Sequence, residues 1–262
     1  MIETRVGYTE WEDHRFCGRS VMNDLCGGLS FSALNVLGIT GRSLSREEAE
    51  LFDELCAGGS APDARAWPLK LIRIVSAYGG FYSGVAATQL CMEGVGAIGP
   101  WLTEASAEAI LDYEACCAAA GGDLEAGFWK LLEKRKRLRG WGVPLRPRDE
   151  RYLSMERSVT KRGRHLLTHW SAMSALSGLL RTHKQIEPNV SAAFGAALLD
   201  LGFSPTQIAP LGCVAINHMF VAHAAESSRE RYPEYQRLAE DDVAYAGPPP
   251  RVLPPEWKRA ST

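Results

Sequence analysis

The spacing of the apolar residues is the feature of this 262-residue sequence that most restricts its fold. In the segment "NVSAAFGAALLDLGF", residues 189–203, apolar side chains recur at intervals of three and four, which places them on one face of a helix. Asn189 is suited to cap the start of this helix, and Gly202 to end it in the left-handed conformation. The same period recurs in every long segment. We therefore expect an all-α fold with fewer than about a tenth of the residues in strands. The stripe comprises Val190, Ala193, Phe194, Ala197, Leu198 and Leu201.

Capping patterns predict where other helices begin. Ser45 and Glu48 have the spacing of a capping box, and Ser204 repeats the pattern with Gln207. Pro210 is expected to bend or restart the second of these helices, because proline cannot donate the helical hydrogen bond.

Three further segments have distinct compositions. The stretch "CGGLSFSALNVLGITGR" predicts a short helix that opens near Ser30 and stops at Gly41. Residues 83–99 are rich in Gly and Ala, which favours a buried helix at a helix–helix or subunit contact. The stretch from residue 244 contains five prolines, which predicts either a loose end or an extended arm laid on another surface. Strand-like alternation is confined to the first twenty residues.

Length and charge limit the classes of function. A chain of this length forms one large or two modest domains and can bury a core without disulfides or metals. The net charge of -2 predicts no general affinity for nucleic acid or for anionic membranes. The first residues are polar and acidic, unlike a signal peptide, and polar residues interrupt every apolar run of membrane-spanning length. Seven cysteines, with no CxxC spacing, predict free thiols and a cytoplasmic location.

The segment "RLRGWGVPLRPRDER", residues 137–151, combines glycines, prolines and five arginines. Arg146, Arg148 and Arg151 lie where the prolines restrict the backbone, and a stiff loop favours bidentate binding of phosphate by guanidinium groups. This predicts an anion-binding loop for a phosphorylated ligand. The basic residues 134–137 just before it can equally be a solvated helix end.

The histidines give a weaker signal. His165 and His169 are four residues apart, so on a continuous helix they would share a face, as a metal pair does. No carboxylate completes a metal motif beside them, and we expect no metal. His218 and His223 are five apart and are expected to point in different directions, each able to form hydrogen bonds within the core.

Six segments, in the same order along the chain, together resemble the citrate synthase superfamily, and within it the short citryl-CoA lyase branch. "LSFSALNVLGITGR" resembles the LSF…LLLTGR helix, "SGVAAT" resembles AAVAAG, and "GWGVPLRPRDER" resembles the loop G-x-G-H-P-x-H-K-P-x-D-P-R. "EPNVSAAFGAALLDLGF" is similar to LPLNVDGAIAAILLDLGF, "FVAHAAES" to GLIAHALEE, and "AYAGPPPRVLP" to Y-x-G-P…R-x-L-P.

The resemblance implies an all-α dimer with a large helical domain, residues 1–105 and 205–262, and a smaller, mobile helical domain, residues 106–204. It implies that coenzyme A binds between the two domains and that a carbon–carbon bond next to an acyl-CoA thioester is made or broken. In the family two histidines and an aspartate perform this chemistry, and an arginine holds the substrate carboxylate.

The sequence departs from the family at each of these four positions. Val143 replaces the loop histidine, and Ser191 replaces the aspartate. Leu102 lies nearest the position of the other histidine, and Ile216 replaces the arginine. None of these side chains can supply the proton transfers of citrate chemistry at neutral pH.

Two readings of the function as a working protein remain open, beside a third in which the chain is a decayed protein retained for its interactions. The first is an enzyme that binds a non-citrate acyl-CoA and makes or breaks a carbon–carbon or thioester bond with other residues, for which His218, His183 and Glu104 are the candidates. Arg146, Arg148 and Arg151 would then bind coenzyme A. The second is a catalytically silent subunit or regulator that pairs with an active paralogue, so both a homodimer and a heteromer are expected partners.

Overall fold

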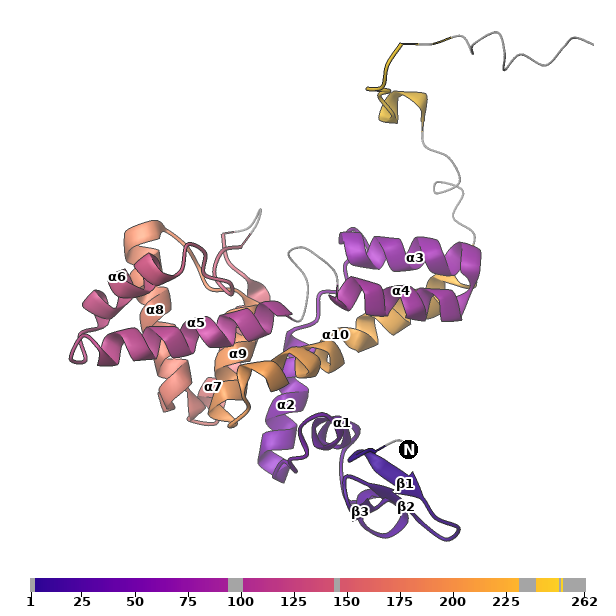
Figure 1. Ribbon diagram of the computed structural model, residues 1–262, viewed down its shortest axis with the longest axis horizontal. Coiled ribbons are helices and arrows are strands. Elements are labelled where there is room, and N and C mark those ends of the chain that lie inside the picture. The colour runs from indigo at the N-terminus through magenta and orange to yellow at the C-terminus, as the bar shows by residue number, and fades with distance from the viewer. Residues whose placement is uncertain (1–2, 94–100, 144–146, 231–238, 250, 252–262) are drawn as a thin grey trace, which may run out of the picture.

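The computed structural model describes residues 3–93, 101–143, 147–230, 239–249 and 251, and within these ranges the chain is mainly helical (Figure 1). This confirms the all-α prediction. The α-helices are α1 Phe31–Thr40, α2 Arg46–Gly58, α3 Trp67–Gly79, α4 Phe81–Glu93, α5 Trp101–Ala118, α6 Leu124–Lys134, α7 Glu150–Lys161, α8 Thr168–Lys184, α9 Val190–Asp200 and α10 Pro205–Ser227.

Helix ends lie where the capping residues predict them. The Asn189 side chain accepts a hydrogen bond from the backbone N–H of Ser191 at the start of α9. Ser45 and Glu48 form a complete capping box on α2. At α1, Ser30 caps the start and Gly41 takes the left-handed conformation at the end, with φ of 73°.

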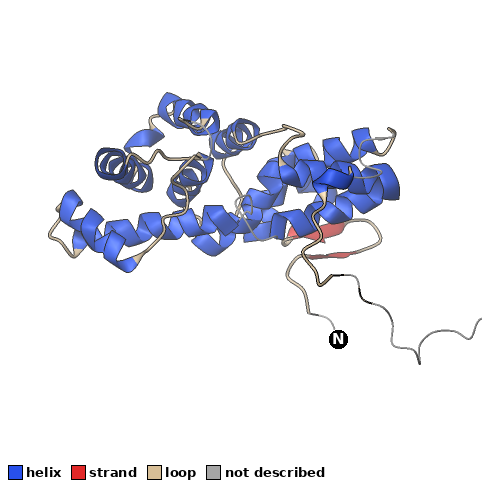
Figure 2. Ribbon diagram, turned by 90° about the horizontal axis from the view of Figure 1, so that it is seen from above, coloured by secondary structure: helices blue, strands red, loops and turns tan. Residues whose placement is uncertain are grey.

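Strands in the described residues are short and lie near the N-terminus. β1 Gly7–Thr9, β2 His14–Phe16 and β3 Arg19–Ser20 form an antiparallel sheet in the order β1-β2-β3. A π-helical turn, Val21–Leu25, leads from β3 toward α1. Figure 2 shows this sheet as a small appendage to an otherwise helical molecule.

Two apolar clusters hold the helices together. The larger cluster joins α2 to α5–α9 and contains the fully buried side chains of Phe52, Phe128 and Trp170. The smaller one joins α3, α4 and the second half of α10 through Leu69, Ile72, Ala87, Phe220 and Ala224. Because α10 contacts α5 at one end and α3 and α4 at the other, it connects the two clusters, as its diagonal path in Figure 1 shows.

Helix α10 runs without interruption through Pro210, so the expected restart at this proline does not occur. The helix is 23 residues long, and an 18-residue window within it has a mean hydropathy of 1.4, which is long and apolar enough to span a membrane by length and composition alone. It contacts α1, α2, α3, α4, α5 and α9, which is how a core helix of a folded domain is placed.

Candidate functional site

A cavity of about 380 Å³ lies where the two apolar clusters meet. Its walls come from the end of α2, the 59–66 connection, the start of α3, the start of α5, the loop before α7, the first turns of α7 and α9, and the middle of α10. Apolar side chains form most of the lining, among them Leu55, Leu69, Met155, Phe194 and Phe220. Such a site suits an elongated ligand with an apolar part.

The four positions at which the sequence departs from the family pattern all line this one cavity. Leu102 comes from α5, Val143 from the loop after Trp141, Ser191 from α9 and Ile216 from α10. These residues are separated by up to 114 positions in the chain, and their convergence supports the placement that the sequence motifs gave them. Three of the four are hydrocarbon side chains, so this part of the cavity cannot exchange protons with a ligand.

Backbone geometry fixes the loop that carries Val143. Gly140 and Gly142 have φ of 94° and 99°, in the left-handed region that favours glycine. Gly142 donates its N–H to the carbonyl of Glu187 at 2.7 Å, and Asn189 donates to the carbonyl of Gly140 at 2.9 Å. The two glycines therefore let the loop run alongside the segment that enters α9, which brings Val143 and Ser191 to the same wall.

Asp149 and Arg151 are the ionisable residues of the described lining, and they are paired with each other. The Arg151 guanidinium donates to both carboxylate oxygens of Asp149, each at 2.9 Å. Asp149 is buried, and it also accepts hydrogen bonds from the backbone N–H groups of Val190 and of Arg151, at the starts of α9 and α7. Burial by itself would raise the pKa of the Asp149 carboxyl, but these hydrogen bonds and the Arg151 charge hold the pKa below its usual value. Asp149 is therefore an ionised structural anchor and a poor base.

The predicted phosphate-binding arginines are only partly brought together. Arg151 lines the cavity with a half-buried side chain. Arg148 is exposed and is not part of the lining, and Arg146 lies outside the described residues. The role of the three arginines remains a prediction.

The candidate catalytic residues lie elsewhere. His183, near the end of α8, stacks on Phe128 and lies 3.3 Å from a carboxylate oxygen of Glu125. His218 is exposed on α10, where its Nε2 lies 2.7 Å from the hydroxyl of Ser60. Glu104, in the first turn of α5, is likewise not among the residues that line the cavity.

The expectation that His165 and His169 share a helical face is wrong. His165 belongs to a short 3-10 turn, Arg164–Leu166, and α8 begins only at Thr168. His169 instead lies 2.8 Å from a carboxylate oxygen of Glu114 on α5. Among the residues that the structure describes, no three His, Cys, Asp or Glu side chains gather as metal ligands would.

Comparison with solved structures identifies the architecture. Citryl-CoA lyase from Hydrogenobacter thermophilus superposes with a TM-score of 0.82, covering 98% of both chains at 22% sequence identity. The chain has the citrate synthase fold. The same fold relates it to the ATP citrate lyase of Methanothrix soehngenii in complex with citrate and coenzyme A, with a TM-score of 0.74, 15% identity and coverage of 95% of this chain and 42% of that one. Citrate synthase from Thermoplasma acidophilum, in a ternary complex with carboxymethyl coenzyme A and oxaloacetate, matches with a TM-score of 0.58 and 18% identity over 86% of this chain and 59% of that one.

No protein-family model matches the sequence, and no curated protein matches it significantly. At these sequence identities the similarity establishes the fold, and it does not by itself establish the function.

Proposed function

We propose that this protein binds a coenzyme A thioester in the cavity between its two helical clusters, and that the acyl group it accepts is apolar. The single observation that carries the proposal is the meeting of Leu102, Val143, Ser191 and Ile216 in one cavity. In the family that the sequence resembles, these positions hold the groups that bind and activate a charged substrate. Here they offer hydrocarbon surface and one hydroxyl.

Charge complementarity supports the apolar acyl group. A carboxylate such as that of oxaloacetate would lose its hydration on entering the cavity, and a buried ion without a partner is costly. Ile216 supplies no positive charge, and the guanidinium of Arg151 already binds Asp149. A short aliphatic acyl chain, in contrast, gains free energy from each CH₂ group that it buries, about 0.8 kcal/mol.

The phosphates of coenzyme A are assigned to the arginine loop. Arg148 is exposed, so a phosphate group can reach it from solvent. Arg151, the last residue of the loop, lines the cavity. Arg146 belongs to the same Pro-restricted segment by sequence.

Of the two readings of the function, the lining favours the catalytically silent one. Asp149 is the single carboxylate of the described lining, and it is already ion-paired. The alternative, a lyase or acyltransferase, would need His218 or Glu104 to reach the ligand after a movement of the helices.

We further propose that a second chain, either another copy or a paralogue, covers the face formed by α3 and α4. Trp67, Leu71 and Tyr78 follow one another along α3 with exposed fractions of 48%, 41% and 60%, and Tyr82 on α4 is 86% exposed. Exposed apolar patches of this kind mark contact surfaces. Multi-angle light scattering tests this proposal: a monomer mass that does not depend on concentration would contradict it.

Calorimetric titration tests the binding proposal. We expect butyryl-CoA to bind more tightly than free coenzyme A, and acyl-CoAs with a terminal carboxylate to bind more weakly than butyryl-CoA. The variant Ile216→Arg should reverse the second preference, because it adds a cation to the lining. Equal affinity of the wild-type protein for butyryl-CoA and free coenzyme A would contradict an acyl site in this cavity.

Mass spectrometry of a panel of acyl-CoAs incubated with the protein separates the two readings. Unchanged thioesters are expected for a silent subunit. Conversion of any of them would establish an enzyme, and the His218→Ala and Glu104→Ala variants would then show whether either residue takes part.

A further inference from the structure

The 59–66 connection between α2 and α3 forms one wall of the cavity without any regular secondary structure of its own. Gly59, Ala61 and Ala66 are part of the lining. We call residues 59–66 the wall loop. Because an irregular segment has no backbone ladder to hold it, its position depends on the contacts made by its neighbours.

Three consecutive residues of the wall loop are held by side chains of α10. The hydroxyl of Ser60 lies 2.7 Å from Nε2 of His218, the N–H of Ala61 points at Sδ of Met219 at 3.1 Å, and the carbonyl of Pro62 lies 2.9 Å from Nε2 of His223. The same stretch of α10 lines the cavity through Ile216, Met219 and Phe220. One helix therefore forms one wall and holds another.

The partners of His223 indicate which of its ring nitrogens donates a hydrogen bond. A carbonyl oxygen can only accept, so Nε2 of His223 carries the proton that it donates to Pro62. On the other side of the ring, Nη1 of Arg73 lies 3.1 Å from Nδ1. A guanidinium can only donate, so Nδ1 is unprotonated and accepts. Both ring nitrogens of His223 thus have a polar partner, and Nδ1 also lies 3.9 Å from a carboxylate oxygen of Glu226.

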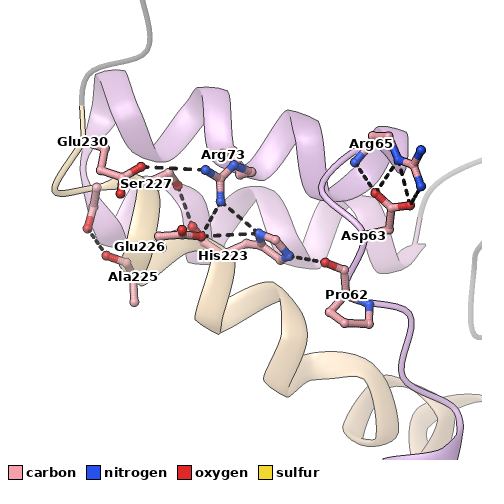
Figure 3. A network of polar contacts seen from close by, with 10 residues as sticks. Pro62, Asp63, Arg65, Arg73, His223, Ala225, Glu226, Ser227 and Glu230 are labelled. Carbon is pink, nitrogen blue, oxygen red and sulfur yellow. Dashed lines mark hydrogen bonds and ion pairs between the residues drawn. The ribbon is translucent and has the colours of Figure 1, made fainter.

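The cation that orients His223 is itself firmly held. The Arg73 side chain is about nine-tenths buried between α3 and α10, and its guanidinium binds Glu226 and lies 3.8 Å from Glu230 (Figure 3). Glu226 and Glu230 are about half exposed, so the network runs from solvent through Arg73 and His223 to the wall loop. Asp63 and Arg65 form an exposed ion pair within the same loop (Figure 3).

We infer that His223, assisted by His218, is a positioning residue that sets the wall loop at the distance from α10 that the ligand requires. The inference rests on the proposed function, since the ligand is the acyl-CoA proposed above. His223 does not line the cavity, and it acts through Pro62 and the neighbouring Ala61. In this inference the role of His218 is structural: its contact with Ser60 helps to hold the wall loop, and it takes no part in catalysis.

The decisive variants are His223→Leu, which removes both hydrogen bonds, and His223→Gln, which offers an amide N–H to Pro62 and a carbonyl oxygen to Arg73. His169→Leu is the matched control, because it removes a histidine–glutamate contact on α8 that does not touch the cavity. Butyryl-CoA affinity is measured by calorimetry, and hydrogen–deuterium exchange is followed at the wall-loop amides.

We expect His223→Leu to weaken butyryl-CoA binding about tenfold, the effect of roughly one lost hydrogen bond, and to speed exchange at Ala61. His223→Gln should bind within about threefold of the wild type, and His169→Leu should bind as the wild type does. Unchanged affinity in His223→Leu, or no rescue by His223→Gln, would overturn the inference.

Two further outcomes remain distinguishable. If the wild type binds no butyryl-CoA, the proposed function fails, and the exchange rates alone decide whether His223 holds the loop: faster exchange in His223→Leu supports it, and equal rates overturn it. If His223→Leu does not fold, His218→Leu at an exposed position takes its place, with faster exchange in the wall loop as the supporting result and unchanged exchange as the opposing one.

Discussion

Replacing Asp149 by alanine is expected to destabilise the protein more than any single ion pair on its surface does. The Asp149 carboxylate is buried and bonds to the backbone at the starts of α7 and α9 and to the side chain of Arg151. The variant therefore removes a helix cap, leaves the N–H of Val190 without its partner and breaks an ion pair in one step.

The magnitude follows from these contacts. Loss of the α7 cap costs about 1 kcal/mol. An unsatisfied N–H at Val190 costs a further 1–3 kcal/mol, roughly. The contribution of Arg151 is limited to about 1 kcal/mol or less, because its side chain is 31% exposed and partly screened by solvent. The expected loss is about 2–5 kcal/mol of unfolding free energy, measured by urea denaturation at pH 7.

The pH dependence of this loss provides an independent check. The pKa of Asp149 is lower in the folded protein than in the unfolded chain, so its contribution is fully present above the unfolded value and is lost as the pH falls through the folded value. The stability difference between wild type and Asp149→Asn, which removes the charge but keeps the shape, should therefore shrink below about pH 4. A loss under about 1 kcal/mol for Asp149→Ala, or a difference that stays constant as the pH falls, would refute this reasoning.

Three further outcomes are expected. The hydrogen bond and charge of Arg162 lower the pKa of Glu54 to about 2, so Glu54→Gln should cost under about 1 kcal/mol at pH 7 and less as the pH falls from about 4 toward 2, as followed by thermal unfolding. Gly140→Ala should cost about 2–4 kcal/mol, because a Cβ there would meet Ser106 Oγ at 2.5 Å, whereas Gly142→Ala, which meets nothing, should cost only about 1–2 kcal/mol of backbone strain. Arg148→Ala should weaken coenzyme A binding by about 1–3 kcal/mol in calorimetry without changing the fold, and an unchanged affinity would remove Arg148 from the site.

Helix boundaries could be predicted where the capping signal is local. Asn189 and the Ser45–Glu48 pair each bond within three residues of their own position, so the sequence contains the whole interaction. The start of α8 could not be predicted in this way. Its first free N–H groups, at His169 and Trp170, are capped by the carboxylate of Asp200 at the end of α9, about thirty residues later. A helix start that depends on a distant residue leaves no pattern in the nearby sequence.

The same distinction between local and long-range interactions applies to the residues of the candidate site. Leu102, Val143, Ser191 and Ile216, which the motifs align with functional positions of the family, line one cavity, and the alignment itself stays a prediction. The anchoring role of Asp149 depends on its hydrogen bond with Val190, which is 41 residues away, so the sequence around Asp149 does not predict this role. The contacts of His218 and His223 with the wall loop likewise join residues about 160 positions apart. Chemistry that depends on long-range contacts of side chains emerges only from the folded structure.

The central claim is that the citrate synthase fold is kept here while the proton-transfer groups of citrate chemistry are gone from the cavity. The most direct measurement is a thiol-release assay with acetyl-CoA and oxaloacetate, run together with the cleavage of citryl-CoA. Because each missing acid–base or oxyanion-stabilising group is typically worth about 10²–10⁴ in rate, we expect turnover several orders of magnitude below that of ordinary enzymes in both directions. Turnover near one per second, roughly the lower end of ordinary enzymes, in either assay would contradict it, because Leu102, Val143, Ser191 and Ile216 could not then be the positions that decide the reaction.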